Sequence, residues 1–370
     1  ATLVTTWYGG ILEIGRFRYQ NGIVTWVIFG LYYYIAALIY GFYIGPILYK
    51  NNINSIPDYF KKNYGIIPGK FVAIIVILIS SPAPYLMILS TLLMHIFKIN
   101  IHISIILGIF FSTIYLYIGG FRSIIKTDKI QFILMFSGFI IMIYYLMSSF
   151  GGINFLLTHV PEKHLSISGK LPIGYILSWS LISMITFIDP SIFQRAYSSK
   201  NSSVVKYGIL TAILFWFIFD IMTITVGLYA AAIIDENLLI GNPYLMLADS
   251  ILPAFFKTIF YISLLSIVMS TVDSFTFVSA FTISKDLLYS KNLYRGTQFG
   301  LLITAIISYC IILNFKQVID IWYIFGSIAA SSILIPFLIL IFTPNKRLRV
   351  PMIVMLIPFF IAVIWIKLII

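Results

Sequence analysis

The amino-acid sequence predicts an all-α integral membrane protein whose helices cross the bilayer many times. Hydrophobic residues make up 61% of the 370 positions, charged residues only 10%, and the mean hydropathy is +1.03. A soluble domain is closer to one quarter charged residues and could not bury this much apolar surface. The apolar residues also form long runs, and about 20 residues of helix suffice to span the hydrocarbon core.

Ten stretches are long and apolar enough to be membrane-spanning helices. Because lipid offers no hydrogen-bond partners to the backbone, each is predicted to be helical where it meets lipid. Membrane-spanning strands are excluded, because the runs are too long and do not alternate apolar with polar residues. The longest polar connection, 151–170, is predicted to be a loop. The ten stretches are 24–49, 66–97, 100–121, 127–150, 171–190, 207–234, 254–284, 297–315, 318–342 and 350–370.

Two segments contain residues that interrupt a helix. The opening segment, 1–15, resembles the latter half of a further helix, and because it starts at Ala1 we expect an N-terminal part to be missing. Its run Thr-Thr-Trp-Tyr-Gly-Gly at 5–10 joins polar side chains to adjacent glycines and predicts a break. Breaks near the bilayer centre expose carbonyl groups and helix ends that bind ions and substrates. The run Ser-Pro-Ala-Pro at 81–84 predicts a bend in the 66–97 helix.

Lys and Arg are distributed unevenly between two sets of alternating connections. One set holds 16 of the 24, and the opposite set, together with the helix ends, holds 8. Because cytoplasmic connections are enriched in Lys and Arg, the first set is predicted to face the cytoplasm, in the plasma (cytoplasmic) membrane. This arrangement explains the net charge of +12 without a nucleic-acid partner. All 24 are thereby assigned, so none is expected in the membrane interior.

The charged residues divide between the two predicted faces as follows. The cytoplasmic set consists of Lys50, Lys61, Lys62, Lys70, Arg122, Lys126, Lys129, Arg195, Lys200, Lys206, Lys285, Lys291, Arg295, Lys346, Arg347 and Arg349. The opposite set consists of Arg16, Arg18, Lys98, Lys163, Lys170, Lys257, Lys316 and Lys367. The acidic residues Asp235, Glu236 and Asp249 lie on that opposite, outer side.

Four acidic residues lie within the apolar runs or at their ends. Asp220 and Asp273 are near the middle of a run, whereas Asp128 and Asp189 are near predicted cytoplasmic helix ends. A buried carboxylate is costly unless it is neutralised or paired, and no interior Lys or Arg is expected. The remaining options are a bound cation, a substrate amine, protonation, or hydrogen bonds from Ser, Thr and Tyr. For Asp220 and Asp273 the alternative is a protonated or hydrogen-bonded acid with a purely structural role.

Hydroxyl residues surround Asp273 along the chain. On a helix, Ile267, Ser270, Thr271 and Ser274 share one face. Hydroxyl and carbonyl oxygens are the ligands that a hard cation such as sodium requires, so this face is a candidate ion site. The alternative is that these hydroxyls bond back to the preceding turn or assist helix packing.

Other kinds of chemistry lack their characteristic residues. The sequence contains no GxxxxGK[ST] loop for ATP, and the four histidines show neither HExxH nor paired-ligand spacing. An intramembrane protease could use Asp220 and Asp273, but its motifs are absent. A single cysteine, Cys310, excludes an internal disulfide. The sequence therefore predicts a carrier of a small solute and not an enzyme.

Four segments of the sequence form a recognisable set. They are Gly119-Gly120-Phe121-Arg122-Ser123 with Lys126-Thr127-Asp128 and Gln131, Ser55-Ile56-Pro57-Asp58-Tyr59 with Tyr64-Gly65, Phe193-Gln194-Arg195 with Ser199-Lys200, and Met269-Ser270-Thr271 with Ser284-Lys285-Asp286-Leu287. In these segments the chain resembles the sodium/solute symporter family, whose members carry sugars, proline, pantothenate, sialic acid or iodide. The segments follow the family's order and cover nearly the whole chain.

The resemblance implies a leucine-transporter-like core made of two inverted five-helix repeats, in a single transporter domain over 1–370. The first repeat, 1–150, would lack its N-terminal part, the second would cover 171–342, and 350–370 would be an extra helix. The helix count agrees with this arrangement, because an odd number of helices per half inverts the second half relative to the first.

The resemblance also implies where ions bind. The family's conserved sodium site falls on the carbonyl groups of Val4, Trp7 and Ile267 and on the side chains of Ser270 and Thr271. A second site, which only some members have, falls on Asp128, Ser270, Asp273 and Ser274. Asp273 stands where a hydroxyl residue is common in the family, so this second site could hold sodium or a proton.

The family's substrate pocket lies between the first, third, sixth and tenth core helices. Position alone suggests Tyr85, Ser183, Thr186 and Trp322 as its residues.

These observations predict a sodium-coupled secondary active importer of a small polar organic solute that works by alternating access. Its partners would be the solute, the sodium ion and the lipid bilayer. Sodium would bridge segment 1–15 and the 254–284 helix, favour the outward-open state and complete the substrate pocket. The alternatives are a proton-coupled symporter that uses Asp273 or Asp220, and a solute sensor of the same fold that does not transport. The solute itself is not predicted.

Overall fold

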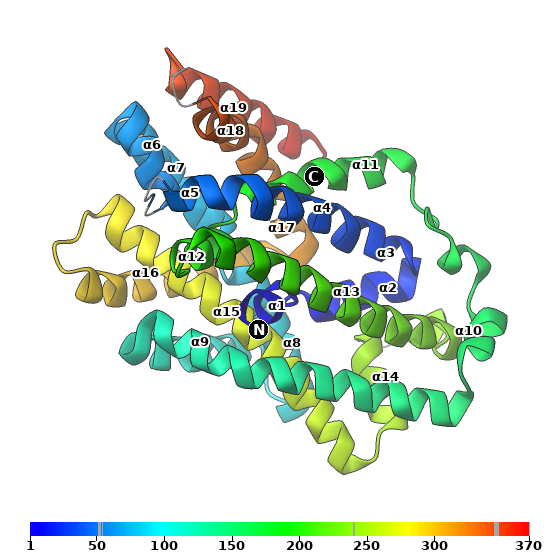
Figure 1. Cartoon of the computed structure of the whole chain (residues 1–370). Coiled ribbons are helices and arrows are strands. Elements are labelled where there is room, and N and C mark those ends of the chain that lie inside the picture. Colours follow the sequence, from blue (N-terminus) through cyan, green and yellow to red (C-terminus); the bar gives the residue numbers. More distant parts are fainter. Residues whose placement is uncertain (51–52, 54, 240, 344–347, 370) are drawn as a thin grey trace.

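The computed structural model describes residues 1–50, 53, 55–239, 241–343 and 348–369. This part of the chain consists of helices and connections and contains no strand. The long helices lie side by side in one bundle, with α1 (Thr2–Trp7) near its middle and α19 (Pro351–Ile369) at its edge (Figure 1). The other helices of the first half are α2 (Ile11–Asn21), α3 (Val24–Trp26), α4 (Tyr32–Ile39), α5 (Gly45–Lys50), α6 (Ile56–Tyr64), α7 (Ile66–Ile79), α8 (Ala83–Phe97) and α9 (Ile101–Phe150).

The second half begins with a short helix inside the region that was predicted to be a loop, 151–170. It consists of α10 (Ile153–His159), α11 (Ile173–Ile182), α12 (Pro190–Tyr197), α13 (Ser202–Ile233), α14 (Pro243–Ile251), α15 (Ala254–Thr282), α16 (Leu293–Asn314), α17 (Val318–Ala329), α18 (Ile335–Phe342) and α19. Short π-helical turns join α3 to α4, α4 to α5 and α17 to α18. Helix α15 lies in the centre, against α1, α8, α9 and α16.

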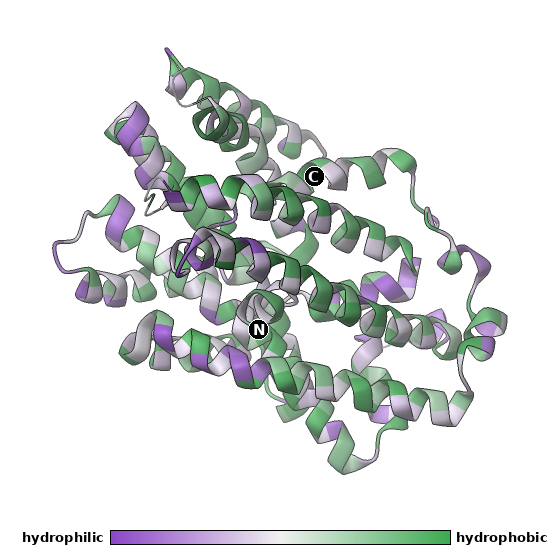
Figure 2. Ribbon diagram, in the orientation of Figure 1, coloured by the Kyte–Doolittle hydropathy of each residue, from purple (hydrophilic) through white to green (hydrophobic). Residues whose placement is uncertain are grey.

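Eight helical segments of the described residues are long and apolar enough to cross a membrane. They agree with the predicted stretches, except that 100–121 and 127–150 are joined in α9, and α19 is a shorter apolar helix. Apolar residues cover the long helices, whereas hydrophilic residues gather at helix ends and connections (Figure 2). The eight segments are Val24–Lys50, Ile66–Phe97, Ile101–Phe150, Ile173–Tyr197, Ser202–Ile233, Ala254–Leu287, Leu293–Asn314 and Val318–Phe342.

Helix α9 runs over 50 residues but is not continuous. Gly120 has φ 53° and ψ −146°, which is not a helical conformation. Only glycine adopts such a positive φ at little cost, because it has no Cβ. The two parts of α9 on either side of Gly120 correspond to the two helices predicted for this region.

Besides α9, three further helical segments are interrupted in the part of the chain that the structure describes. Helix α1 ends at Trp7 and α2 begins at Ile11, and α7 is likewise separated from α8, so both breaks predicted from the sequence are present. The third break corrects the prediction of one continuous helix over 171–190. After α11 the chain forms a 3-10 helix, and α12 begins at Pro190 with Asp189 as its N-cap. Proline at the first position and aspartate at the cap favour a new helix start.

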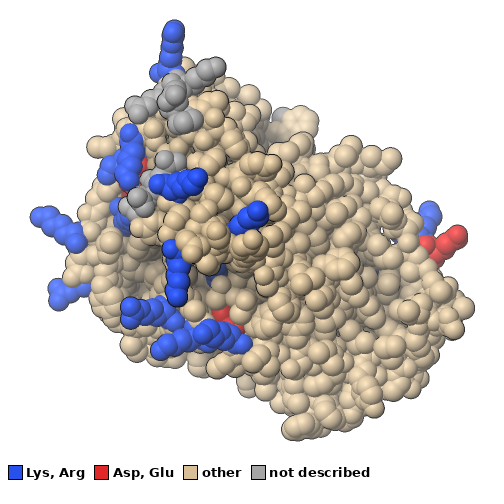
Figure 3. Space-filling model, in the orientation of Figure 1, with Lys and Arg blue, Asp and Glu red and all other residues tan. Residues whose placement is uncertain are grey.

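Positive side chains gather at one end of the molecule, where α6 and α16 lie (Figure 3). The sequence predicts this distribution, because the connections rich in Lys and Arg alternate along the chain and so fall on one side of the membrane. Lys346 and Arg347, which belong to that prediction, lie outside the described residues.

Candidate functional site

The break between α1 and α2 lies directly against α15. The Thr271 hydroxyl donates to the Thr6 carbonyl oxygen at 2.9 Å and lies 3.4 Å from the Ile267 carbonyl oxygen. A Cβ atom added to Gly9 would come within 2.4 Å of Thr271, so the glycine permits this close approach. The interrupted helix and the hydroxyl face predicted from the sequence therefore meet.

Helix α1 presents carbonyl oxygens at this contact because it stops there. The Tyr8 N–H bonds to the Thr5 carbonyl, and the last carbonyl groups of a helix have no following turn to bond. They also carry the partial negative charge of the helix C-terminus, which favours a cation. Val4 and Trp7, whose carbonyls were predicted as sodium ligands, belong to this final stretch of α1.

A second group of polar residues lies beside the first. The Ser270 hydroxyl donates to Asp128 Oδ1 at 2.6 Å. Arg195 Nη2 donates to Thr6 Oγ1 at 2.8 Å and to Ser274 Oγ at 2.9 Å. The same nitrogen lies 3.7 Å from Asp128 Oδ2. Of the residues predicted for a second ion site, the structure thus brings Asp128, Ser270 and Ser274 together around a guanidinium group.

Asp273, the fourth residue predicted for that site, makes no hydrogen bond to this group. It is fully buried, and neither of its carboxylate oxygens has a hydrogen-bond partner among the described residues. An unpartnered buried carboxylate is costly as an anion, so it requires a proton or a cation.

Arg195 corrects the expectation that no Lys or Arg lies in the interior. The sequence assigned it to a cytoplasmic connection, but α12 is a separate helix after the break at Asp189, and the Arg195 side chain is only 8% exposed. Its long apolar stem can extend along the bundle while the guanidinium reaches carboxylates and hydroxyls.

Arg18 is the second correction, and it neutralises Asp220. Arg18 Nη2 lies 2.6 Å from Asp220 Oδ1, with both side chains almost fully buried. The Tyr34 hydroxyl donates to the other carboxylate oxygen, Oδ2. The sequence placed Arg18 beyond the end of a helix, whereas α2 continues to Asn21 and carries it inside. Asp220 is thus a paired, hydrogen-bonded acid, as in the structural alternative considered for it.

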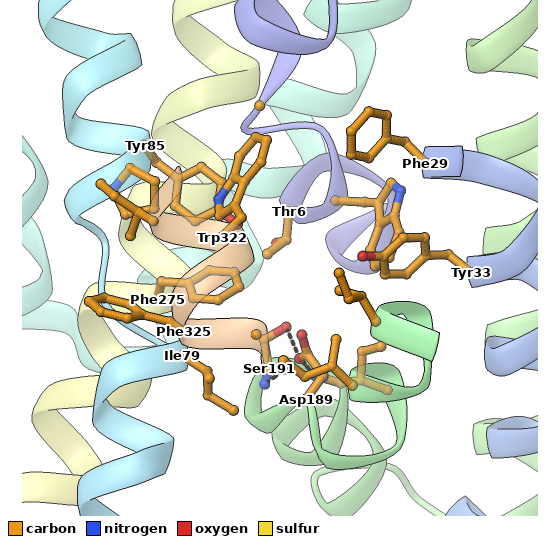
Figure 4. Close-up of a pocket in the computed structure, with 18 of the residues that line it drawn as sticks. Thr6, Phe29, Tyr33, Ile79, Tyr85, Asp189, Ser191, Phe275, Trp322 and Phe325 are labelled. Carbon is orange, nitrogen blue, oxygen red and sulfur yellow. Dashed lines mark hydrogen bonds between the residues drawn. The ribbon is translucent and has the colours of Figure 1, made fainter. Parts of the chain in front are cut away.

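A cavity of ≈ 170 Å³ adjoins these contacts, and Figure 4 shows it. This is smaller than the roughly 300–1,000 Å³ of drug-sized ligand sites, so it suits a small solute. Tyr85 and Trp322, predicted from position, both line it. Ser183 and Thr186, predicted in the same way, are not among its lining residues and donate to carbonyls of their own helix turn. Thr6 and Trp7 of α1 also line the cavity, which joins it to the α1–α15 contact.

Asp189 and Ser191 contribute polar groups to the wall of the cavity, and the sequence analysis did not assign them to it. Asp189 Oδ1 accepts hydrogen bonds from the Ser191 N–H and hydroxyl at 2.8 and 2.7 Å and from the Ile192 N–H at 2.9 Å. The pair Asp189-Pro190 was the available signal, because Asp followed by Pro favours a helix start. It was overlooked because the surrounding run is long and apolar enough to be one helix.

Similarity to known proteins identifies the family of this chain. The model of the sodium:solute symporter family matches residues 14–357. The chain belongs to the sodium:solute symporter family. Members of this family and the solved structures similar to the chain are transporters.

Two curated symporters are similar in sequence. The chain is 28% identical over 240 residues to the sodium/pantothenate symporter of Haemophilus influenzae, a match that covers 59% of this chain and 49% of that protein. It is 26% identical over 220 residues to sodium/glucose cotransporter 1 of Oryctolagus cuniculus, covering 47% of this chain and 31% of that protein. The matched regions thus span half or less of these relatives.

Solved structures show the fold of this symporter family member. A Na+-coupled sialic acid symporter in a substrate-bound outward-open state superimposes with a TM-score of 0.77 at 15% identity, covering 94% of this chain and 78% of that one. A nucleobase-cation-symport-1 family transporter in a closed conformation gives 0.64 at 12% identity, covering 99% and 92%. The chain is therefore an all-α, multi-pass membrane protein with the leucine-transporter-like fold of inverted repeats.

Proposed function

We propose that this chain imports a small polar organic solute across the plasma membrane by sodium-coupled alternating access. The observation that carries the proposal is the position of α1. Its Thr6 carbonyl accepts a hydrogen bond from Thr271, while Thr6 and Trp7 line the adjacent cavity. One interrupted helix therefore belongs to both the candidate ion site and the candidate solute site, which is the arrangement that coupling requires.

The proposed sodium ligands are the carbonyl oxygens of Val4, Trp7 and Ile267 and the hydroxyls of Ser270 and Thr271. Sodium bound between α1 and α15 would replace the direct bond from Thr271 to the Thr6 carbonyl. An ion that binds one conformation more tightly shifts the population toward it. Through the shared helix, sodium would thereby raise the affinity for solute, and solute would raise the affinity for sodium by the same factor.

The second ion site is proposed on Asp128, Ser270, Asp273 and Ser274. Arg195 already provides a positive charge near Asp128, so an added cation there would require Arg195 to withdraw. Asp273, which has no partner among the described residues, supports proton coupling as the second candidate function. Uptake driven by a sodium gradient at equal pH, against uptake driven by a pH gradient without sodium, separates the two.

Thr271→Ala tests the proposed site. The variant removes one ion ligand, so the sodium concentration for half-maximal uptake into proteoliposomes should rise at least about tenfold, equivalent to about 1.4 kcal/mol. Thr258→Ala is the matched control, because Thr258 lies on the same helix, is exposed and bonds only to the Ala254 carbonyl. Unchanged sodium dependence in Thr271→Ala, with Thr258→Ala also normal, would remove the site from consideration.

A further inference from the structure

The Asp189 carboxylate has one oxygen fixed by the protein and one available to the cavity. Oδ1 accepts the three hydrogen bonds that cap α12. Among the described residues, none donates a hydrogen bond to Oδ2. The side chain is partly exposed although it lies inside the bundle, because it lines the cavity. Capping of α12 thus uses Oδ1, whereas Oδ2 has no hydrogen-bond donor among the described residues and can meet a solute.

Nine aromatic residues of the described chain line the cavity beside aliphatic ones. Figure 4 shows Tyr85, Phe275, Trp322 and Phe325 on one side and Phe29 and Tyr33 on the other, with Asp189 and Ser191 between them at one end. Asp189 is the one charged side chain among the described residues that line the cavity. The faces of aromatic rings attract cations, Trp most strongly, and the attraction grows when the site excludes water.

The charges near the cavity do not cancel. Arg195 lies 3.7 Å from Asp128 and donates to Thr6 and Ser274, and among the described residues no Lys or Arg forms an ion pair with Asp189. Arg18 is occupied by Asp220 in a separate pair. A buried carboxylate without compensation is costly, so a cation in the cavity would be favoured over a neutral solute of the same shape.

We propose that the solute carries an alkylated ammonium group, bound between Asp189 and the aromatic rings. The carboxylate supplies the opposite charge, and the rings contact the alkyl substituents on nitrogen through both apolar and cation–π interactions. A neutral solute fits less well, because it would leave the Asp189 carboxylate without an opposite charge. The inference rests on the proposed transport function, and it specifies the solute class for that same site.

Choline and its uncharged isostere 3,3-dimethyl-1-butanol test the charge directly, since the two differ in one atom. The measurement is the apparent Tm of the purified full chain in detergent, with sodium present, over a concentration series of each compound. Choline should raise Tm saturably, whereas the isostere and glucose should require at least about tenfold higher concentration, a ratio worth about 1.4 kcal/mol. Equal responses to choline and the isostere, a response to glucose alone, or no response to choline would overturn the proposal.

The variant Asp189→Asn tests whether Asp189 is the residue that binds the ammonium group. Asparagine also caps helices well, so α12 should remain intact while the charge is lost. The variant should lose the choline response at least about tenfold and keep its Tm without ligand. Retention of the choline response would overturn the assignment. Sodium alone should still raise the Tm of Asp189→Asn but not that of Thr271→Ala. A wrong solute class would therefore change only the choline response, whereas a wrong sodium site would change the sodium response.

Discussion

Two buried arginines determine how the acidic residues of the core are balanced. Arg18 forms a closed pair with Asp220, whereas Arg195 is shared among Asp128, Thr6 and Ser274. The hydroxyl face of α15 was predictable from the sequence, because helical periodicity alone places Ser270 and Thr271 together. The burial of the two arginines was not predictable from the sequence. It depends on where the interrupted helices end, and the apolar runs locate those helix ends only to within several residues.

The Arg18–Asp220 pair yields a stability prediction. Asp220→Leu leaves a guanidinium buried without its carboxylate, which should destabilise the protein by about 3–5 kcal/mol. The double variant Arg18→Met/Asp220→Leu leaves no charge and should be more stable than Asp220→Leu alone. Chemical unfolding of the purified proteins in detergent measures both. Arg16→Met is the control, since the exposed contact of Arg16 with Glu13 at 3.9 Å should contribute almost nothing.

If the double variant is no more stable than Asp220→Leu, the loss comes from the packing around Asp220 and not from the unpaired charge.

His164, in the short 3-10 helix Glu162–Leu165 between α10 and α11, predicts a pH dependence of stability. Burial lowers the pKa of its imidazole, although the hydrogen bond between Nε2 and the Tyr19 carbonyl at 2.9 Å partly opposes that shift. The folded state thus favours the neutral ring. Below the ordinary pKa of about 6.5 the unfolded state binds more protons, so this contribution is complete above that pH and lost as the pH falls below it.

The measurement compares the apparent Tm at about pH 7.5 and about pH 5.5 for the parent and for His164→Gln. Glutamine keeps an N–H donor but does not titrate, so its Tm should fall less on acidification. The same fall in both proteins would show that His164 is not the responsible group.

At the scale of elements, breaks in helices build the site. Those at 5–10 and 81–84 were predictable, because they contain adjacent glycines or two prolines. The one between α11 and α12 was not, because a single Asp-Pro pair sits inside an apolar run long enough for a full span. Each break frees backbone groups that a continuous helix would satisfy internally. The break between α11 and α12, which was not predicted, places Asp189 and Ser191 at the cavity.

Gly120 offers a test of the break within α9. With φ 53° and ψ −146°, an added Cβ would be strained, so Gly120→Ala should destabilise the protein by about 1–3 kcal/mol. Gly208→Ala is the control, because Gly208 lies inside α13 and an added Cβ would meet nothing within 4 Å. Thermal unfolding should show a loss for the first and none for the second. Equal Tm values would mean that α9 can continue through Gly120 without strain.

At the scale of the whole molecule, composition and the length of the apolar runs were sufficient to predict an all-α, multi-pass membrane protein, because lipid allows few alternatives to apolar helices. The family and its inverted-repeat core came from the resemblance of four sequence segments and not from composition. The shape of the cavity was not readable, since it is formed by side chains from helices far apart in sequence. The resemblance suggested four lining residues from their positions alone. Tyr85 and Trp322 do line the cavity, whereas the hydroxyls of Ser183 and Thr186 bond to carbonyls of their own helical turn.

The orientation in the membrane is a prediction for the entire chain. Because Cys310 is the single cysteine, Cys310→Ser provides a background for placing one reporter thiol. In intact cells a membrane-impermeant maleimide should label Lys163→Cys and should reach Lys291→Cys only after permeabilisation. Both positions are exposed in the structure, so accessibility differs only by side. The opposite labelling pattern would place the basic connections outside.

Charges that are covalently attached to helices move whenever the helices move. Arg195 belongs to α12 and Asp128 to α9, with 3.7 Å between Nη2 and Oδ2. A displacement of α12 relative to α9 along the membrane normal therefore moves charge through the transmembrane electric field with no ion bound. One elementary charge carried across 100 mV is worth about 2.3 kcal/mol. In a transport cycle that includes such a displacement, the membrane voltage would bias the conformations of the protein directly, even without a bound ion.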